Sequence, residues 1–361
     1  MRFVHTGDFH IGRIPEKEFS FAQQRSREIF ETFEKIVTYT KEIDADLLLI
    51  AGDLFDCRPK VRELKEVCSV LSRLGRTHVV ITAGNHDYVG EKSAYLGFAW
   101  PENVTFIDSS VPTGVYFEDI NTEVYGFSYH SRNVYDNVTA DVQPENPDHI
   151  NILMVHGGDA ADVPIDIKQL VQSDFDYIAL GHIHKPDRLA ENMFFCGSPE
   201  PLDRNETGSH GFMTGVIEEG TDAVKCFNFV DFSGRKYIKK TFEITPDMAG
   251  SSLKEKVSQA IAESGPENYY SIVFEGRRDP DIMFDRDVFL DRKCFDEING
   301  SGAVVDVEDR TVPDFDYDRM LEENGDNVIG LFISEMRRQN ADDEIIRKAL
   351  DYGVSALLGI E

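Results

Sequence analysis

Five apolar segments between residues 1 and 186 each end at glycine beside aspartate, asparagine or histidine, and this repeated ending constrains the fold more than any other feature. In α/β proteins, ligands bind outside the carboxyl ends of the strands. Glycine at these points lets the backbone turn sharply and approach a ligand. One such ending means little, but five together predict polar side chains gathered at one edge of a sheet. The endings are Gly7-Asp8-Phe9-His10, Gly52-Asp53, Gly84-Asn85-His86-Asp87, His156-Gly157-Gly158 and Gly181-His182-Ile183-His184.

The segments between these endings alternate between strand and helix patterns. Residues 45–53 form an apolar run of the kind seen in strands that are covered on both faces. Ile29, Phe33 and Ile36 recur at helical spacing within a helix predicted over 23–42. This alternation predicts an α/β layered domain. Residues 193–232 contain short strand patterns with glycine turns, which we expect to extend the same sheets.

The pattern changes near residue 240. Residues 240–310 combine strand patterns with one helix predicted over 251–263, which is typical of a small α+β domain. From Phe315 onward the pattern is helical, with helices predicted over 317–324, 327–339 and 342–358. We therefore divide the chain into three parts, which are 1–235, 236–312 and 313–361.

The residue types at the strand ends narrow the chemistry. Aspartate, asparagine and histidine without cysteine form a mixed nitrogen and oxygen donor set, which suits Mn²⁺, Fe²⁺ or Zn²⁺ and excludes a thiolate zinc site. His182 and His184 are two apart and point to the same side of an extended backbone, although a polar turn that happens to contain two histidines is the alternative. Seven candidate ligands suit two ions better than one: Asp8, His10, Asp53, Asn85, His156, His182 and His184.

The motifs at these endings resemble those of a known superfamily. The series Gly-Asp-x-His, Gly-Asp-x-x-Asp, Gly-Asn-His-Asp, His-Gly-Gly and Gly-His-x-His resembles the calcineurin-like metallophosphoesterases. Within that superfamily, HTGDFHIGR, AGDLFD and GNHD resemble the SbcD-type nucleases of DNA double-strand-break repair over residues 1–235, whereas residues 240–361 are similar only in layout. The resemblance implies an α/β fold: a two-sheet layered sandwich flanked by helices, then a small α+β capping domain and a C-terminal helical tail.

The resemblance also implies a role for each candidate. Asp53 would bridge two divalent metal ions, for which we expect Mn²⁺, with Fe²⁺ or Zn²⁺ as alternatives. A bridging hydroxide would attack phosphorus in line. His86 would stabilise the transition state and protonate the leaving oxygen, with Asp87 orienting its ring. The remaining ligands divide into Asp8, His10 and His184 for one ion and Asn85, His156 and His182 for the other.

The net charge of −29 argues against broad, non-specific binding to nucleic acid. The first hundred residues are nevertheless close to neutral, so a local basic strip could contact phosphate. An ordinary solvated mixture of charges is the alternative. Candidate substrate-binding residues are Arg13, Arg58 and Lys185.

The leading functional hypothesis is a metal-dependent DNA exonuclease or endonuclease acting at DNA ends. A phosphatase or cyclic-nucleotide phosphodiesterase on the same core is the alternative, and an inactive scaffold is a third. Protein phosphatases of this superfamily carry Gly-Asp-x-x-Asp-Arg-Gly and Gly-Asn-His-Glu. This chain departs from both, with Cys57 after Asp56 and Asp87 after His86.

The expected partners are DNA and, through the C-terminal helices, an SMC-like coiled-coil ATPase (SbcC-like), as the resemblance implies. Helices that fold back on the second domain are the alternative, and a homodimer is a further expectation. No membrane contact is expected, because the sequence has no run of about 18 apolar residues. Five cysteines without close pairing and no secretory signal predict a cytoplasmic protein.

Overall fold

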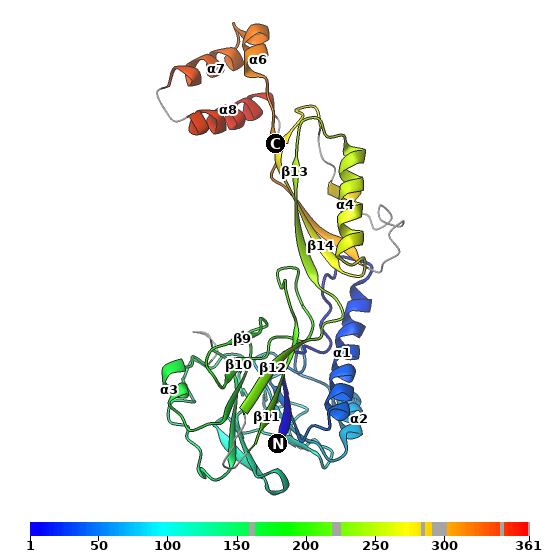
Figure 1. Cartoon of the computed structure of the whole chain (residues 1–361), viewed down its shortest axis with the longest axis vertical. Helices are drawn as coiled ribbons and strands as arrows, with labels where there is room; N and C mark the ends of the chain where they lie inside the picture. The colour runs from blue at the N-terminus through cyan, green and yellow to red at the C-terminus, as the bar shows by residue number, and fades with distance from the viewer. Residues whose placement is uncertain (159–162, 219–224, 283–285, 291–301, 340–342, 360–361) are drawn as a thin grey trace. The chain divides into compact units, whose positions relative to one another are not determined.

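The computed structural model describes the whole chain except residues 159–162, 219–224, 283–285, 291–301, 340–342 and 360–361 (Figure 1). The described residues form two compact units, Met1–Lys236 and Tyr237–Glu361. The further division of the second unit at residue 313 stays a prediction.

The first sheet has the strand order β12-β11-β1-β2-β3-β4. Strands β1 to β4 run parallel to one another, and β11 pairs antiparallel with β1 and with β12. The helices α1 (Ala22–Glu42) and α2 (Val61–Leu71) cover one face through a shared core that includes Phe33 and Leu64. The strands are β1 (Arg2–Thr6), β2 (Leu47–Ala51), β3 (His78–Thr82), β4 (Val104–Phe106), β11 (Gly211–Ile217) and β12 (Lys225–Asp231).

The second sheet has the strand order β5-β6-β7-β8-β10-β9. Its strands β6, β7, β8 and β10 are parallel, and the edge strands β5 and β9 are antiparallel to their neighbours. Its elements are β5 (Thr113–Phe117), β6 (Thr122–Gly126), β7 (Ile150–His156), α3 (Ile167–Val171), β8 (Tyr177–Gly181), β9 (Asp187–Arg188) and β10 (Met193–Phe195). Among the described residues of this unit, Ser72–Leu74 and Glu118–Ile120 form short 3₁₀ helices.

The two sheets pack face to face. Phe3 and Leu49 of the first sheet share a buried core with Ile152, Met154 and Tyr177 of the second. The central strand β2 is apolar throughout because the helices cover the outer face of the first sheet and the second sheet covers its inner face. The predicted α/β two-sheet sandwich is confirmed.

The second unit contains a parallel sheet of β13 (Tyr237–Ile244), β14 (Tyr269–Arg278) and β15 (Ala303–Asp309), with β16 (Val312–Pro313) paired to the end of β14. Helix α4 (Gly250–Ser264) packs on this sheet through Leu253, Val257 and Ile261. A short helix α5 (Arg286–Leu290) adds Phe289 to the same core.

Three helices end the chain, and they form a small core of their own. This core contains Tyr317, Ile333, Leu350 and Val354. The helices are α6 (Tyr317–Asn324), α7 (Val328–Arg338) and α8 (Asp343–Leu358), and the turn between the last two falls outside the described residues. Among the described helices, none combines the length and the apolar character that crossing a membrane requires.

Candidate metal centre

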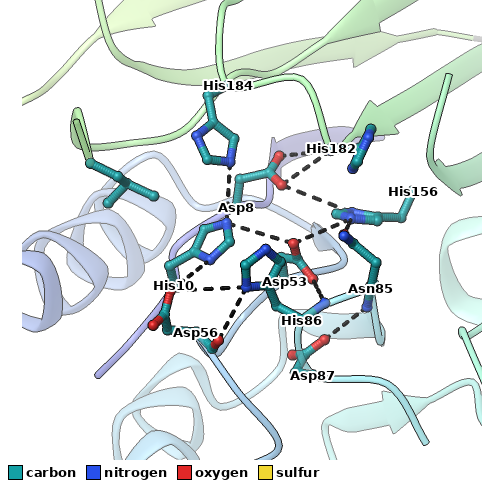
Figure 2. A network of polar contacts seen from close by, with 12 residues as sticks. Asp8, His10, Asp53, Asp56, Asn85, His86, Asp87, His156, His182 and His184 are labelled. Carbon is teal, nitrogen blue, oxygen red and sulfur yellow. Dashed lines mark hydrogen bonds and ion pairs between the residues drawn. The ribbon is translucent and has the colours of Figure 1, made fainter. Parts of the chain in front are cut away.

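The candidate ligands lie at the carboxyl ends of strands from both sheets (Figure 2). In the first sheet, Asp8 and His10 follow β1, Asp53 follows β2 and Asn85 follows β3. In the second sheet, His156 is the last residue of β7, and His182 and His184 follow β8. The two sets face each other where the sheets meet, because contacts link β2 with both β7 and β8.

The backbone at these positions is unusual. Asp8, His10, Asp53 and His182 have φ angles of 51°, 50°, 46° and 90°, in the left-handed region that residues other than glycine rarely adopt. Such conformations persist where the surrounding structure determines them, and they gather at functional sites. Here the backbone amide of Asp8 donates to the carbonyl of Gly52 (3.1 Å) and that of His10 donates to the carbonyl of Asp53 (3.0 Å).

Two glycines make room for this packing. A β-carbon on Gly52 would lie 2.3 Å from Nδ1 of His156, and one on Gly84 would lie 2.3 Å from Oδ1 of Asp53. Gly52 also has a φ of 83°. The glycines at the strand ends are therefore needed for the close approach that the sequence pattern predicts.

One group of donor atoms comes from Asp8, His10 and His184. One ligand atom of each residue lies within 4.8 Å of the others. The Nε2 atoms of His10 and His184 are 3.1 Å apart. Two imidazole nitrogens beside a carboxylate suit a divalent transition metal, so this group fits the first expected ion.

A second group surrounds Asp53. Nε2 of His156 lies 3.4 Å from Oδ2 of Asp53 and 3.0 Å from Oδ1 of Asn85. Oδ2 of Asp53 is also 3.6 Å from Nε2 of His10. Asp53 thus contacts a histidine of each expected set, which fits the bridging position, and Asp8, Asp53 and His156 form a further group within 4.8 Å.

His182 contacts the site through its backbone amide and through its ring. Its backbone amide donates to both oxygens of Asp8, at 3.1 and 3.0 Å. Its ring lies against that of His156, with 5.1 Å between the ring centroids. Among the described residues it does not enter a group of clustered donor atoms. Its role as a ligand therefore stays a prediction.

The buried charges of the site stabilise one another. Burial disfavours the charge on Asp53, but His156 and then His10 outweigh it and hold the pKa of this carboxyl well below its ordinary value. Burial also disfavours the charge on His156, and the Asp53 carboxylate outweighs it and raises the pKa of His156 to about 10. A metal binds the neutral imidazole, so a divalent cation would replace the positive charge that this proton supplies.

His86 and Asp87 do not form the expected pair. The carboxylate of Asp87 accepts hydrogen bonds from the backbone amides of Gly84 (2.8 Å) and Phe55 (3.2 Å) and from the hydroxyl of Tyr95 (2.7 Å). Nδ1 of His86 instead donates to the backbone carbonyl of Asp56 (3.1 Å). The expectation that Asp87 orients the His86 ring is thus not met. Asp87 is fully buried beneath the 84–87 turn and holds that turn in place.

The backbone of His86 is held by Asp53. Its amide donates to Oδ1 of Asp53 at 2.9 Å. His10, Asp53 and His86 also form a group of donor atoms within 4.8 Å. His86 therefore lies within reach of the same centre as the expected ligands.

Two carboxylates that we did not predict contact the site. Oδ1 of Asp56 lies 3.4 Å from Nδ1 of His10, and Oε1 of Glu206 lies 2.7 Å from Nδ1 of His184. Asp56 is the last residue of the AGDLFD motif, three residues after Asp53, so the motif itself indicated that this carboxylate could lie near the site. Glu206 is 22 residues from its histidine, and no local pattern connects them.

The three candidate substrate-binding residues differ in their contacts with the residues of this centre. Arg13 donates to Asp56 (3.1 Å), beside His10. Arg58 is exposed and lies over the ring of Tyr88, 5.2 Å from its centroid. Lys185 is exposed next to His184.

The fold and the paired donor groups define a metal-dependent phosphoesterase. The sequence model of the calcineurin-like phosphoesterase family matches residues 1–186, and the chain belongs to this family. It is a family of hydrolases that hold two divalent metals.

Three relatives show where the likeness extends. The DNA double-strand break repair protein Mre11 of Methanocaldococcus jannaschii is 27% identical over 371 residues, which cover 94% of this chain and 96% of that protein. Mre11 of Methanopyrus kandleri is 28% identical over 61% of this chain and 55% of its own length. YhaO of Bacillus subtilis, an uncharacterized metallophosphoesterase, is 29% identical over 61% of this chain and 58% of its own length. The chain thus spans less than two thirds of these last two relatives.

Proposed function

We propose that this protein is a metal-dependent phosphodiesterase that cleaves DNA at its ends, as an exonuclease, an endonuclease or both. The observation that carries the proposal is the position of Asp53, with Oδ2 at 3.6 Å from His10 and 3.4 Å from His156. One carboxylate between two donor groups suits a two-metal hydrolase. The alignment with an Mre11 protein along 94% of the chain supports DNA as the substrate.

The proposed first cation site consists of Asp8, His10 and His184, the second of Asn85, His156 and His182, with Asp53 shared. When bound, two divalent cations, Mn²⁺ in our proposal, neutralise charge on the phosphate and supply the nucleophile for an in-line displacement. Burial of Asp8, His10, Asp53 and His156 keeps these ligands in place before substrate arrives. A site that is organised in advance loses little free energy to rearrangement during the reaction.

His86 is the proposed general acid. Its Nδ1 is engaged with the carbonyl of Asp56, so Nε2 is the atom that can give a proton to the leaving oxygen. Its side chain is 30% exposed, in contrast to those of His10 and His156, which are buried. Substrate can therefore reach it from solvent, as proton transfer requires.

DNA binding must overcome the net charge of −29. The proposed local contacts are Arg13, Arg58 and Lys185, together with the two cations. Arg13 already pairs with Asp56, so its interaction with phosphate would compete with this ion pair. The affinity for DNA should fall as salt rises, since each phosphate contact releases a counterion.

The C-terminal helices are the proposed docking site for an SMC-like coiled-coil ATPase (SbcC-like). Val328 and Leu331 on α7 and Ile345 and Tyr352 on α8 are exposed, whereas the core of these helices is buried. An apolar helix face is a common way to bind another chain. A cytoplasmic location and a homodimer are further parts of this proposal.

The test compares substrates. The metal-free protein is incubated with Mn²⁺ and end-labelled double- or single-stranded DNA, beside bis(p-nitrophenyl) phosphate and p-nitrophenyl phosphate. We expect Mn²⁺-dependent cleavage of DNA and of the diester, with little cleavage of the monoester. Cleavage of the small diester without cleavage of DNA would favour a cyclic-nucleotide phosphodiesterase, and cleavage of the monoester alone would favour a phosphatase.

A further inference from the structure

The 197–206 segment holds both the backbone and the ring of His184. The backbone amide of Ser198 donates to the carbonyl of His184 at 2.9 Å. Nδ1 of His184 donates to Oε1 of Glu206 at 2.7 Å, and the two side chains are 25% and 22% exposed. The position of this candidate ligand therefore depends on a loop as well as on the end of β8.

The other oxygen of Glu206 is also engaged. Oε2 accepts the backbone amide of Leu202 at 2.8 Å, and the amide of Glu206 donates to the carbonyl of Asp203 at 2.9 Å. The carboxylate thus closes the 202–206 turn on itself while it holds the imidazole. Because both oxygens have a partner, the carboxylate has one well-defined orientation.

The same turn is tied to a second loop. Arg204 donates to Glu16 (2.5 Å) and to Glu18 (2.6 Å), which precede α1. The two loops line a hollow of about 280 Å³, together with Arg13 and Asp56. Glu206 is thus attached to an anchored segment rather than to a freely moving one.

The two buried imidazoles of the site, those of His156 and His10, are oriented in other ways. Nδ1 of His156, at the end of the second sheet's β7, donates to the backbone carbonyl of Ala51 in the first sheet (2.9 Å). Nδ1 of His10 lies 3.4 Å from Asp56. A shift of the 202–206 turn would therefore act on His184 while leaving His156 in place.

We infer that Glu206 is a positioning residue that directs Nε2 of His184 toward Asp8 and His10 and so sets the affinity of one of the two cation sites. The inference rests on the proposed two-metal function. A hydrogen bond from Nδ1 keeps the proton on that atom and leaves the Nε2 lone pair for a cation. Loss of such a partner typically weakens metal binding about 10–100-fold.

Two substitutions of Glu206 remove either both of its hydrogen-bond acceptors or only one. Glu206→Ala removes both acceptors, whereas Glu206→Gln keeps one carbonyl oxygen, which can serve His184 or Leu202 but not both. The matched control is Glu123→Gln, which changes a similar pair outside the site, with Oε2 of Glu123 at 3.2 Å from Nδ1 of His149. All variants are made in the full chain, and thermal unfolding checks that each one folds.

The experiment titrates Mn²⁺ into the metal-free proteins by calorimetry, with no substrate present. We expect two ions on the wild type and on Glu123→Gln. Glu206→Ala should bind one ion normally and the other about 10–100-fold more weakly, with Glu206→Gln between the two. Excess Mn²⁺ should restore the second ion.

The outcomes distinguish this inference from the function on which it rests. If Glu206→Ala and Glu206→Gln both fold and bind two ions as the wild type does, Glu206 is not a positioning residue, while the proposed function stands. Equal weakening of both ions would also overturn the inference. If the wild type binds no Mn²⁺, both the inference and the two-metal function are wrong. Should Glu206→Ala fail to fold, the Gln variant decides the matter alone.

Discussion

Nε2 of His156 lies 3.4 Å from Oδ2 of Asp53, although His156 ends a strand of the second sheet and Asp53 follows a strand of the first. Both side chains are buried, so the two residues meet only when the sheets pack against each other. The candidate centre therefore forms only when the two sheets pack together, and a cation that binds there should stabilise the fold by mass action.

Asp53→Asn tests the shared position of this carboxylate. The amide removes the negative charge that faces His10 and His156, so most of the metal should be lost. Activity should fall on the order of 10³-fold or more, since metal-ion catalysis contributes several kcal/mol. Metal content by mass spectrometry and turnover on DNA check this. Asp119→Asn is the control, because Asp119 forms an exposed pair with His78 (2.9 Å). Full metal content in Asp53→Asn would contradict the bridging assignment.

His86→Ala separates proton transfer from metal binding. Both ions should remain, while turnover on DNA falls by about 10²–10⁴-fold, the usual contribution of a general acid. The defect should be smaller on bis(p-nitrophenyl) phosphate, because p-nitrophenolate leaves without protonation. Loss of one ion would instead make His86 a ligand, in keeping with its place in the group with His10 and Asp53.

His5 should link stability to pH. This histidine is fully buried, its Nδ1 contacts the hydroxyl of Tyr177 (2.9 Å), and burial lowers its pKa to about 3. Below pH 6.5, His5 is protonated in the unfolded chain but stays neutral in the folded chain. The free energy of unfolding therefore falls as the pH drops from 6.5 toward 3. The slope from this residue is at most about 1.4 kcal/mol per pH unit.

Chemical unfolding of wild type and His5→Asn between pH 4.5 and 7.5 measures this slope. The variant should lose stability at neutral pH and show a shallower fall on the acid side. His130→Asn, at an exposed position, is the control. An unchanged slope in His5→Asn would show that other groups account for the acid sensitivity.

The exposed face of the tail should mediate partner binding. Leu331 is 62% exposed and Tyr352 is 77% exposed. Leu331→Glu combined with Tyr352→Glu should abolish capture of the co-expressed SMC-like ATPase in a pull-down, because charge replaces the apolar contact. Metal content and diester cleavage should be unchanged.

Point substitutions are preferable to deletion of the tail. Arg277 of β14 pairs with Asp351 of α8 (2.7 Å) and with Asp314 before α6 (3.3 Å), so removal of the helices would take the Asp351 carboxylate away from this arginine. The control is Val111→Glu, which changes an equally exposed apolar residue of the first unit. Normal capture by the double variant would show that this face is not the docking surface.

Much of the site could be predicted from local sequence. Each candidate ligand stands within a few residues of a strand end, so apolar runs and glycine positions were enough to single out Asp8, His10, Asp53, Asn85, His156, His182 and His184. Their roles as ligands stay predictions. The helices of the tail also follow their local periodicity, and α6 spans 317–324 as predicted. These features depend on neighbours in the chain, which a sequence displays directly.

The sequence by itself thus determined which residue types stand at the strand ends and which chemistry they can support. The tertiary structure alone decided which of them meet. Only the packing of the two sheets brings His156 to Asp53, and only a loop folded back over 22 residues brings Glu206 to His184. It also directed Asp87 to Gly84, Phe55 and Tyr95 instead of the ring beside it. The physical reason is that side-chain partners are chosen by distance and direction in space, and residues adjacent in sequence can face opposite ways.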